Sequence, residues 1–220
     1  MFDLTLSFDN GPEPEVTPRV LDILRERDIK ATFFVIGQKL EDPARRRLVA
    51  RAHDQGHWIG NHTLTHSVPL GLQDDPNAAA HEIGRTQALI GELAHEDCWF
   101  RPFGGGGHLD ARLLRPSVVT YLCRNRYSCV LWNAVPRDWT DPDGWVDRAL
   151  AQCRAQDWCL MVLHDLPTGA MNHLEEFLDG AAQAGAHFRQ DFPPSCVPIR
   201  NGEIVQPIDS YVSAIDERRE

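Results

Sequence analysis

Side chains that could do chemistry stand directly after the apolar segments of this chain, where the strands of an α/β protein would end. They are Asp9, Asn10, His62, His66, Arg101, Asp138, His164 and Asp165. Aspartate and histidine can act as general base and general acid, and neutral imidazoles bind Zn²⁺ and similar ions. An ion held by three protein ligands, with one position left for water, makes a hydrolytic site. The residue types therefore indicate metal-assisted hydrolysis.

His62 and His66 are four positions apart, and a helical segment would bring both imidazoles to one side. The pair alone is weak evidence, because the chain has 10 histidines and most such pairs are polar surface or capping residues. Its weight comes from the other residues of the set.

The elements that must position these residues alternate along the chain. We expect strands at residues 4–8, 31–36, 57–60, 98–101, 128–133 and 159–163. We expect helices at residues 16–27, 42–55, 76–95, 110–126, 142–155 and 171–184. Repeated strand-then-helix units predict an α/β fold with a parallel sheet and outer helices. About seven strands favour closure into a distorted (β/α) barrel, whose reactive groups gather at the carboxyl ends of the strands.

The carboxyl-terminal part of the chain departs from this alternation. Asn201-Gly202 is a hairpin-type turn between two short apolar runs. We therefore expect residues 1–190 to form the main domain, and residues 191–220 to form a hairpin and a charged tail packed on it.

Composition narrows the classes of partner and compartment. A formal net charge of −10 argues against nucleic acid, since no basic stripe is available to displace counterions. The chain has no run of about 18 apolar residues, so the sequence predicts no membrane span. The six cysteines form no CxxC pair, which favours free thiols in a reducing compartment. The first residues are unlike a secretory signal, so we expect a cytoplasmic protein, secreted only if a signal peptide was removed. The oligomeric state stays open.

Five segments resemble, in order, the five motifs of the polysaccharide deacetylases, the NodB-homology or carbohydrate esterase four family. Residues 7–12 resemble its TFDDGP motif, residues 60–66 its GNHTxxH motif and residues 100–104 its arginine-proline-aromatic-glycine motif. Residues 137–139 resemble the end of its DxxDW motif, and residues 160–165 its closing LxxxH motif. The resemblance covers residues 4–165. It implies a NodB-type barrel and an enzyme that removes N- or O-acetyl groups from a carbohydrate.

The resemblance also implies roles for the residues that move protons. Asp9 would be the general base and His164 the general acid. Arg101 would pair with Asp9 and hold its carboxylate ionised, since a neighbouring guanidinium favours the charged form. Asp138 would hydrogen-bond the His164 imidazole and favour its protonated form.

A further implication is a divalent metal ion bound by Asn10, His62 and His66. We expect Zn²⁺, with Co²⁺ or Ni²⁺ as alternatives. The implied substrate-binding residues are Phe103, Gly104, Trp139 and Leu163. The last two would form a small apolar pocket for the acetyl methyl group, and the backbone amide near Phe103 would help to stabilise the tetrahedral oxyanion.

Three positions depart from the family pattern. Asn10 stands where the family carries a metal-binding aspartate, which predicts weaker metal binding. The third motif is one residue shorter than usual and is followed by four glycines, residues 104–107. Val135 stands where the fourth motif has its first acid, so Asp138 would carry the electrostatic role of that motif alone.

Several functions stay open at this point. The first is hydrolysis of acetyl groups on N-acetylglucosamine in a chitin-type or peptidoglycan-type glycan. An acetylxylan esterase would use the same residues on an ester. A member of the same fold that acts on a small cyclic amide would have little use for the His62 and His66 pair. The non-enzymatic alternative is a degenerate homologue that binds metal or sugar without turnover, which Asn10 motivates.

Overall fold

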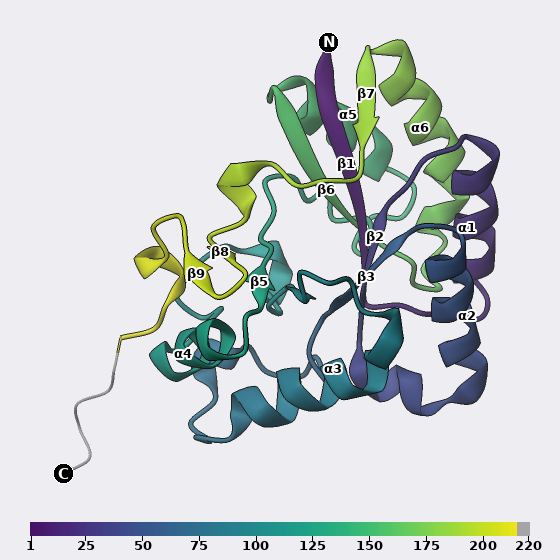
Figure 1. The fold of residues 1–220 in the computed structure, drawn as a ribbon. Coiled ribbons are helices and arrows are strands. Elements are labelled where there is room, and N and C mark those ends of the chain that lie inside the picture. The colour runs from purple at the N-terminus through teal and green to yellow at the C-terminus, as the bar shows by residue number, and fades with distance from the viewer. Residues whose placement is uncertain (215–220) are drawn as a thin grey trace.

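The computed structural model describes residues 1–214 of the chain (Figure 1). Its strands are β1 (Phe2–Asp9), β2 (Thr32–Val35), β3 (Trp58–Asn61), β4 (Trp99–Phe100), β5 (Ser128–Cys129), β6 (Trp158–His164), β7 (Ala186–Arg189), β8 (Ile199–Arg200) and β9 (Glu203–Ile204). Its α-helices are α1 (Thr17–Glu26), α2 (Pro43–Asp54), α3 (Arg85–Ile90), α4 (Pro116–Arg124), α5 (Trp145–Arg154) and α6 (Leu174–Gln183). Strands and helices alternate through most of the chain, as the sequence predicts.

The strands form one curled sheet in the order β6-β1-β2-β3-β4-β5-β8-β9. The first half of β1 also pairs with β7, and its second half pairs with β2. Strands β1 to β7 run parallel, whereas β8 runs antiparallel to β5 and β9 antiparallel to β8. The predicted parallel sheet of about seven strands is confirmed, with a short antiparallel extension at one edge.

A single bridge closes the sheet into a distorted barrel. Beyond β5 the chain continues to Ala134, which pairs with Met161 of β6. The Val162 amide donates to the Ala134 carbonyl at 3.0 Å, and the Ala134 amide donates to the Leu160 carbonyl at 3.3 Å. The predicted barrel is therefore confirmed, although one pair of hydrogen bonds makes this part of its wall.

Strand alternation decides which side chains face the helices and which face the barrel interior. Apolar residues of β1, such as Leu6 and Phe8, pack into the core beneath the helices. Because successive side chains point to opposite faces, Ser7 and Asp9 face the interior. Val162 and His164 of β6 face the interior for the same reason. The two strands thus present polar groups at their carboxyl ends, inside the barrel.

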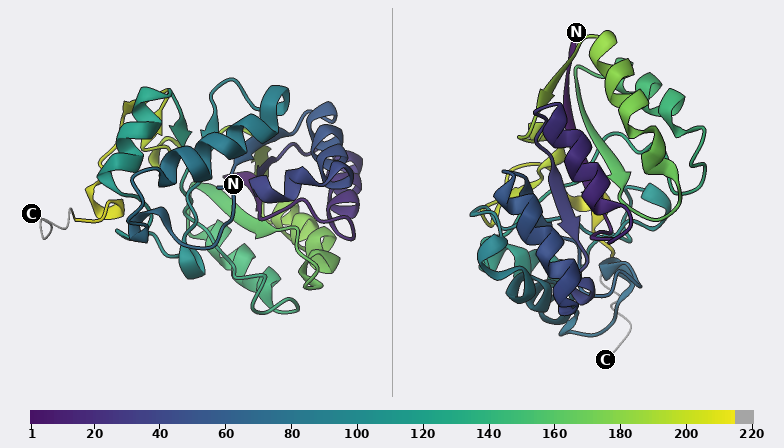
Figure 2. Two further views of the ribbon diagram at one scale, coloured as in Figure 1. Left: turned by 90° about the horizontal axis from the view of Figure 1, so that it is seen from below. Right: turned by 90° about the vertical axis from the view of Figure 1, so that its right-hand side faces the viewer.

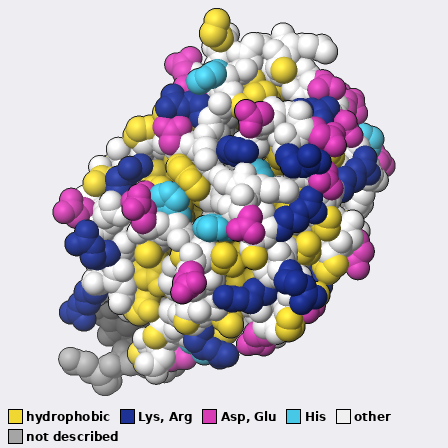
Figure 3. Space-filling view, turned by 45° about the vertical axis from the view of Figure 1, so that its right-hand side comes forward, with side chains coloured by type: hydrophobic (Ala, Val, Ile, Leu, Met, Phe, Trp, Pro, Cys, Tyr) yellow, Lys and Arg dark blue, Asp and Glu magenta, His cyan; other side chains and the backbone are white. Residues whose placement is uncertain are grey.

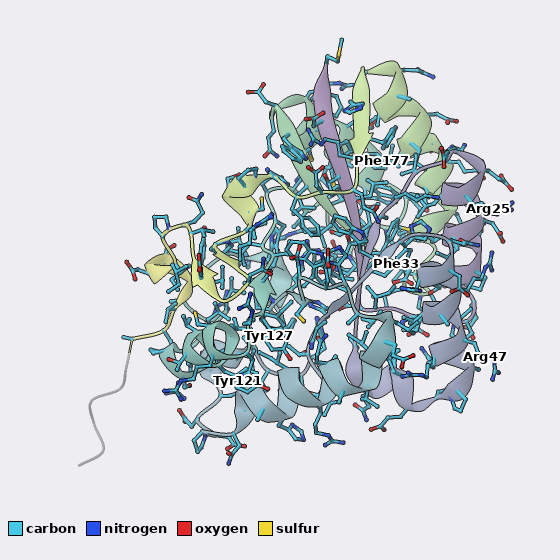
Figure 4. The ribbon with its side chains drawn as sticks, viewed as in Figure 1. Arg25, Phe33, Arg47, Tyr121, Tyr127 and Phe177 are labelled. Carbon is cyan, nitrogen blue, oxygen red and sulfur yellow. The ribbon has the colours of Figure 1, made fainter. Side chains whose placement is uncertain are left out.

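The outer helices cover the outside of the curled sheet (Figure 2), and the buried residues of helices such as α5 and α6 are apolar. Helix α2 begins with Pro43 after Asp42, whose carboxylate accepts the Ala44 amide at 2.8 Å, a common way to start a helix. Phe33 from β2 and Phe177 from α6 are buried in the core between sheet and helices, whereas exposed Arg47 of α2 extends outward (Figure 4). Burial of these apolar faces holds the layers together.

Two predicted helices are shorter than expected. The helix predicted at residues 110–126 begins only at Pro116, because a residue before proline is held in extended backbone and Arg115 adopts φ −109° and ψ 160°. The helix predicted at residues 76–95 consists of a π-helical turn, η3 (Ala80–Gly84), followed by α3. Gly91, with φ 59°, ends it, as glycine often does in the left-handed region.

The remaining differences concern bounds and one strand. The strand predicted at residues 128–133 ends at Cys129. The next two carbonyls, of Val130 and Leu131, accept hydrogen bonds from the Arg101 guanidinium at 3.3 Å each, and so, within the described part of the chain, they do not bond a neighbouring strand. Helix α5 begins at Trp145, and a 3-10 turn (Ala170–His173) precedes α6. No strand was predicted at the residues of β7, because this segment has no apolar run.

The carboxyl-terminal hairpin is confirmed. Ile199 of β8 pairs with Ile204 of β9 around the Asn201-Gly202 turn, whose two residues have positive φ as a type I′ turn requires. The last six residues of the predicted tail, 215–220, lie outside the described residues.

The lengths of the helices, the cysteines and the surface charges complete the description of the fold. No helix within residues 1–214 is long and apolar enough to cross a membrane. All six cysteines are free thiols, as predicted. Acidic and basic side chains are interspersed over the face shown in Figure 3.

Candidate active site

A pocket of about 220 Å³ lies at the carboxyl ends of the strands, where the sequence predicts the reactive groups. It is lined by Asp9, Asn10, His62, His66, Pro102, Phe103, Gly104, Gly106, Gly107, Trp132, Val135, Trp139, Val162, His164 and Leu166. Eight of the eleven predicted site residues are in this set. Arg101 and Asp138 lie behind it, each bonded to a lining residue, and Leu163 lies elsewhere.

Asp9 is a buried carboxylate held by a buried arginine. Arg101 Nη1 donates to Asp9 Oδ1 at 2.8 Å and to Ser7 Oγ at 2.7 Å, and its guanidinium lies over the Phe34 ring at 4.1 Å. Burial works to raise the pKa of Asp9, but the charge and hydrogen bond of Arg101, together with His62 and His164, outweigh burial, and the pKa lies below its usual value of 3.8. Asp9 is therefore ionised at neutral pH.

His164 is paired with a fully buried carboxylate. Asp138 Oδ1 lies 2.8 Å from His164 Nδ1, and Asp138 Oδ2 accepts the His164 backbone amide at 2.8 Å. Burial works to lower the pKa of His164, but the hydrogen bond and charge of Asp138, with smaller effects of Asp9 and Asp165, outweigh burial, so the pKa lies above 6.5. Since Nδ1 is bonded to Asp138, Nε2 is the nitrogen available to a substrate.

Strand register brings Asp9 and His164 together. They are partner residues at the ends of the neighbouring parallel strands β1 and β6, and both line the pocket. A carboxylate and a protonated imidazole on one pocket can accept a proton at one place and donate one at another.

His62 presents a free ring nitrogen beside Asp9. Its Nδ1 lies 2.8 Å from the Arg101 carbonyl oxygen, which can only accept, so Nδ1 carries the proton. Its Nε2 then has a lone pair and lies 3.6 Å from Asp9 Oδ2. Burial lowers the pKa of His62, so the imidazole is neutral. A neutral imidazole fixed by its second nitrogen is the usual form of a metal ligand.

His66 reaches His62 through a loop and not through a helix. The segment from His62 to His66 has no helical turn, and Thr63 and His66 have positive φ. The two rings nevertheless lie 4.8 Å apart, centroid to centroid. The predicted helical segment is therefore absent, but the two imidazoles lie side by side as its spacing predicted. Burial, and then His62, lower the pKa of His66 to about 3.

Asn10 also lines the pocket, and its side-chain oxygen has no partner within residues 1–214. Its Oδ1 is buried and has no hydrogen-bond partner among the described residues. The residue has φ 73°, a conformation that asparagine tolerates better than most side chains, and its carbonyl accepts from Lys39 Nζ at 2.6 Å. A buried amide oxygen without a partner is costly unless a cation or donor faces it.

These donors fit a divalent cation. Within residues 1–214, no three His, Cys, Asp or Glu side chains are grouped to hold a metal ion. The pocket lining supplies two neutral imidazoles, and the Asn10 amide oxygen is the third ligand that the family resemblance implies. Nitrogen ligands suit Zn²⁺, and an amide carbonyl can complete the set without adding charge.

The predicted substrate-binding residues divide into three in the pocket and one outside it. The Phe103 ring lies tilted against the His66 ring with centroids 3.9 Å apart, and the Trp139 and His164 rings meet edge to face with centroids 4.6 Å apart. Gly104 also lines the pocket. Leu163 does not, because its side chain faces the helices and is fully buried in their core. This placement corrects the expectation for Leu163, and Val162, one position earlier, lines the pocket instead.

Three of the four glycines, Gly104, Gly106 and Gly107, line one side of the pocket. A side chain at Gly104 would collide with the Trp132 ring, and Gly106 and Gly107 adopt positive φ. The Gly107 carbonyl accepts from Trp132 Nε1 at 3.2 Å. The segment is therefore an ordered turn against Trp132, in which the positions of Gly104, Gly106 and Gly107 favour glycine.

Some residues of the site were not predicted. Ser7 bonds Arg101, and Val162 lines the pocket; both stand two positions before a reactive residue, so strand alternation could have found them. Glu82, which bonds the loop between His62 and His66, lies in a predicted helix and carries no local signal.

Comparison with known proteins now bears on the same residues. Residues 3–115, just over half of the chain, match the sequence profile described as polysaccharide deacetylase. A chitooligosaccharide deacetylase from Rhizobium leguminosarum bv. phaseoli is 34% identical over 168 residues, which cover 74% of this chain and 67% of the relative. The chain belongs to the polysaccharide deacetylase family.

Two further proteins support this membership. A peptidoglycan-N-acetylglucosamine deacetylase from Bacillus cereus is 31% identical over 166 residues, which cover 74% of this chain and 72% of the relative. A family 4 acetyl xylan esterase from Clostridium thermocellum, solved with a cobalt ion, has a TM-score of 0.69 and 25% identity. That match covers 85% of this chain and 87% of the esterase. This member of the polysaccharide deacetylase family is thus a hydrolase that acts on carbon–nitrogen bonds other than peptide bonds, on the distorted NodB-type barrel that the resemblance implied.

Proposed function

We propose that this protein hydrolyses the acetamido group of N-acetylglucosamine residues in a chitin-type or peptidoglycan-type glycan, with the help of a divalent metal ion. The observation that carries the proposal is the register of β1 and β6, which puts the ionised carboxylate of Asp9 and the imidazole of His164 on one pocket beside two neutral imidazoles. The relatives named as chitooligosaccharide and peptidoglycan deacetylases support the substrate class.

The metal ion would be held by Asn10, His62 and His66, with Zn²⁺ as the first expectation. Co²⁺ is an alternative that the cobalt-containing esterase supports, and Ni²⁺ is another. When bound, such an ion supplies Lewis acidity, which polarises a carbonyl oxygen and makes water a stronger acid.

Asp9 and Arg101 serve the nucleophilic half of the reaction. Oδ1 of Asp9 is occupied by Arg101, so Oδ2 is the oxygen that accepts the proton of the attacking water. Arg101 keeps the carboxylate ionised and prevents it from rotating, because it also bonds Ser7 and two backbone carbonyls. The guanidinium therefore positions the base and does not touch substrate.

His164 and Asp138 serve the leaving group. His164 Nε2 donates its proton to the departing sugar nitrogen, which would otherwise leave as an unstable anion. Asp138 holds Nδ1 and so fixes the ring orientation. One proton thus enters at Asp9 and another leaves from His164 on the same pocket.

Apolar side chains would hold the acetyl methyl group. Trp139 and Val162 flank His164, and Leu166 adds to the same wall. Phe103 and Gly104 form the wall beside His66, and the Phe103 amide is the expected donor to the oxyanion. The pocket walls therefore suit a small acyl group next to a polar ring.

The test is acetate release combined with metal analysis. Purified protein loaded with Zn²⁺ or Co²⁺ is incubated with N-acetylglucosamine oligomers, peptidoglycan fragments and acetylxylan, and acetate is measured. Release from the amide substrates supports the proposal. Release from acetylxylan alone would favour the ester-cleaving alternative, which the similarity to the esterase motivates. Bound metal without acetate release from any substrate would favour a degenerate binding protein.

A further inference from the structure

A buried carboxylate lies beneath the loop that carries the two histidines. Glu82 belongs to the π-helical turn η3 and is only 5% exposed. No lysine or arginine in residues 1–214 forms an ion pair with it, and its one charged-type neighbour is His81 at 3.7 Å. A buried acid with no such partner needs hydrogen bonds to compensate for lost hydration.

Glu82 finds these bonds in the histidine loop. Its Oε2 accepts the backbone amides of Leu64 and Thr65, each at 2.9 Å, and its Oε1 accepts the Thr65 hydroxyl at 2.9 Å. Both amides lie between His62 and His66 in sequence. The carboxylate therefore binds the middle of the loop at three points.

The other side of the loop is held as well. The Gly37 amide donates to the Thr63 carbonyl at 2.9 Å, and the Gln38 amide donates to the Leu64 carbonyl at 3.0 Å. The His66 amide donates to Thr63 Oγ1 at 3.2 Å. With these contacts, Glu82 supplies the acceptors that complete the pairing of the loop's peptide groups.

We propose that Glu82 is a positioning residue for the histidine loop and so tunes the affinity of the metal site. The inference rests on the proposed function, in which His62 and His66 bind the metal. His66 has φ 51°, a conformation that non-glycine residues adopt at a cost, so its place depends on the contacts that hold the loop. Without Glu82, two amides and a hydroxyl lose their acceptor, and the loop relaxes away from the geometry that brings the rings together.

The chemistry of the contacts distinguishes two substitutions. Glu82→Ala removes every acceptor. Glu82→Gln keeps one oxygen for the two amides and places an NH₂ group beside the Thr65 hydroxyl, which can accept because Ser67 Oγ, at 2.7 Å, can take its proton. Hydrogen bonding, and not charge, is the requirement, so the glutamine variant should keep the loop in place.

The experiment measures Zn²⁺ affinity by competition with a chromophoric chelator, and the visible spectrum of the Co²⁺-loaded protein. We expect Glu82→Ala to bind Zn²⁺ about 10–100-fold more weakly, as found when partners of metal ligands are removed, and to alter the Co²⁺ spectrum. Glu82→Gln should stay close to the wild type. Glu92→Ala, an exposed acid beyond the same helical segment, is the matched control and should change neither readout.

The outcomes separate this inference from the proposed function. If the wild type binds no Zn²⁺ or Co²⁺, the proposed metal dependence fails and the inference fails with it. If the wild type binds metal and folded Glu82→Ala binds it equally well, only the inference is overturned. A Glu82→Gln variant as weak as the alanine variant would overturn the hydrogen-bonding role. If circular dichroism shows that Glu82→Ala is unfolded, Glu82→Asp decides, since its shorter side chain cannot reach both amides, and unchanged affinity would overturn the inference.

Discussion

At the scale of single residues, the two oxygens of Asp9 have different tasks. Oδ1 is bonded to Arg101 at 2.8 Å, and Oδ2 lies 3.6 Å from His62 Nε2. Asp9→Asn keeps the size of the side chain but cannot take a proton, so we expect kcat/KM to fall about 10²–10⁴-fold or more. Acetate release measures the loss, and circular dichroism checks the fold. The control is Asp28→Asn on the surface, and activity retained by Asp9→Asn would exclude Asp9 as the base.

The pair of His164 and Asp138 predicts the pH profile. The pKa of His164 is raised above 6.5, and the general acid acts only when protonated, so activity should decline as pH rises through this raised pKa. Asp138→Asn removes the negative charge, which lowers the pKa of His164 and should move this basic limb to lower pH. The profile of kcat/KM against pH measures the shift. A limb at the same pH in both proteins would mean that another group sets it.

Asn10 predicts a gain of metal affinity. Its buried Oδ1 has no partner among the described residues, and a carboxylate in its place would add a negative charge at the proposed cation. Asn10→Asp should therefore bind Zn²⁺ more tightly than the wild type in a chelator competition. Unchanged affinity would remove position 10 from the set of ligands.

At the scale of elements, neighbouring residues of β6 have different roles: Leu163 packs in the core and Val162 lines the pocket. Leu163→Ala should lower the free energy of unfolding by about 2–5 kcal/mol, because Leu163 is fully buried in the helix-facing core. Its KM should not change. Val162→Phe should instead fill the pocket and lower kcat/KM, with a smaller effect on stability. Urea denaturation and acetate release distinguish the two, and the reverse pattern would contradict the assigned faces.

The turn after β1 packs against the end of β6 through Asp165. This carboxyl group is fully buried, contacts the Thr17 hydroxyl and leaves Oδ1 without a partner among the described residues. Burial raises the pKa of Asp165 to about 7, so the native state binds a proton that the unfolded state has lost above its value of 3.8.

Asp165 should therefore make the protein less stable as pH rises. Between the two pKa values the native state holds more protons, and the free energy of unfolding should fall by up to about 1.4 kcal/mol per pH unit. Asp165→Asn should flatten this slope in urea denaturation between pH 4 and pH 7. An identical slope in both proteins would show that Asp165 does not titrate in this range.

At the scale of the whole molecule, local patterns predicted most of the fold. Alternating strands and helices gave the parallel barrel, and Asn201-Gly202 gave the hairpin. The bridge from Ala134 to Met161 and the early end of β5 could not be predicted, because they depend on the Arg101 side chain and on contacts between distant segments. The observed helix bounds also differ from the predicted ones where proline or glycine constrains the backbone, as at Pro116 and Gly91.

Site residues that belong to motifs could be predicted from the sequence, whereas residues whose position depends on packing could not. Asp9, His62 and His164 follow strands and meet in the pocket. Leu163 was misplaced, although strand alternation alone would have favoured Val162. Glu82 could not be predicted, because its function depends on which loop its helix happens to cover. Compartment and oligomeric state stay predictions or open questions.

The pairing of β1 with β6 has a consequence for how the protein matures. Asp9 and His164 belong to the first strand and to the sixth, so the reactive pair can form only after the chain has been made through residue 164. Contacts between such distant segments form slowly, because a long stretch of chain must lose its freedom first. During synthesis, a nascent chain would carry its base and both imidazoles well before its proton donor arrives, and catalytic competence would arise in one late step.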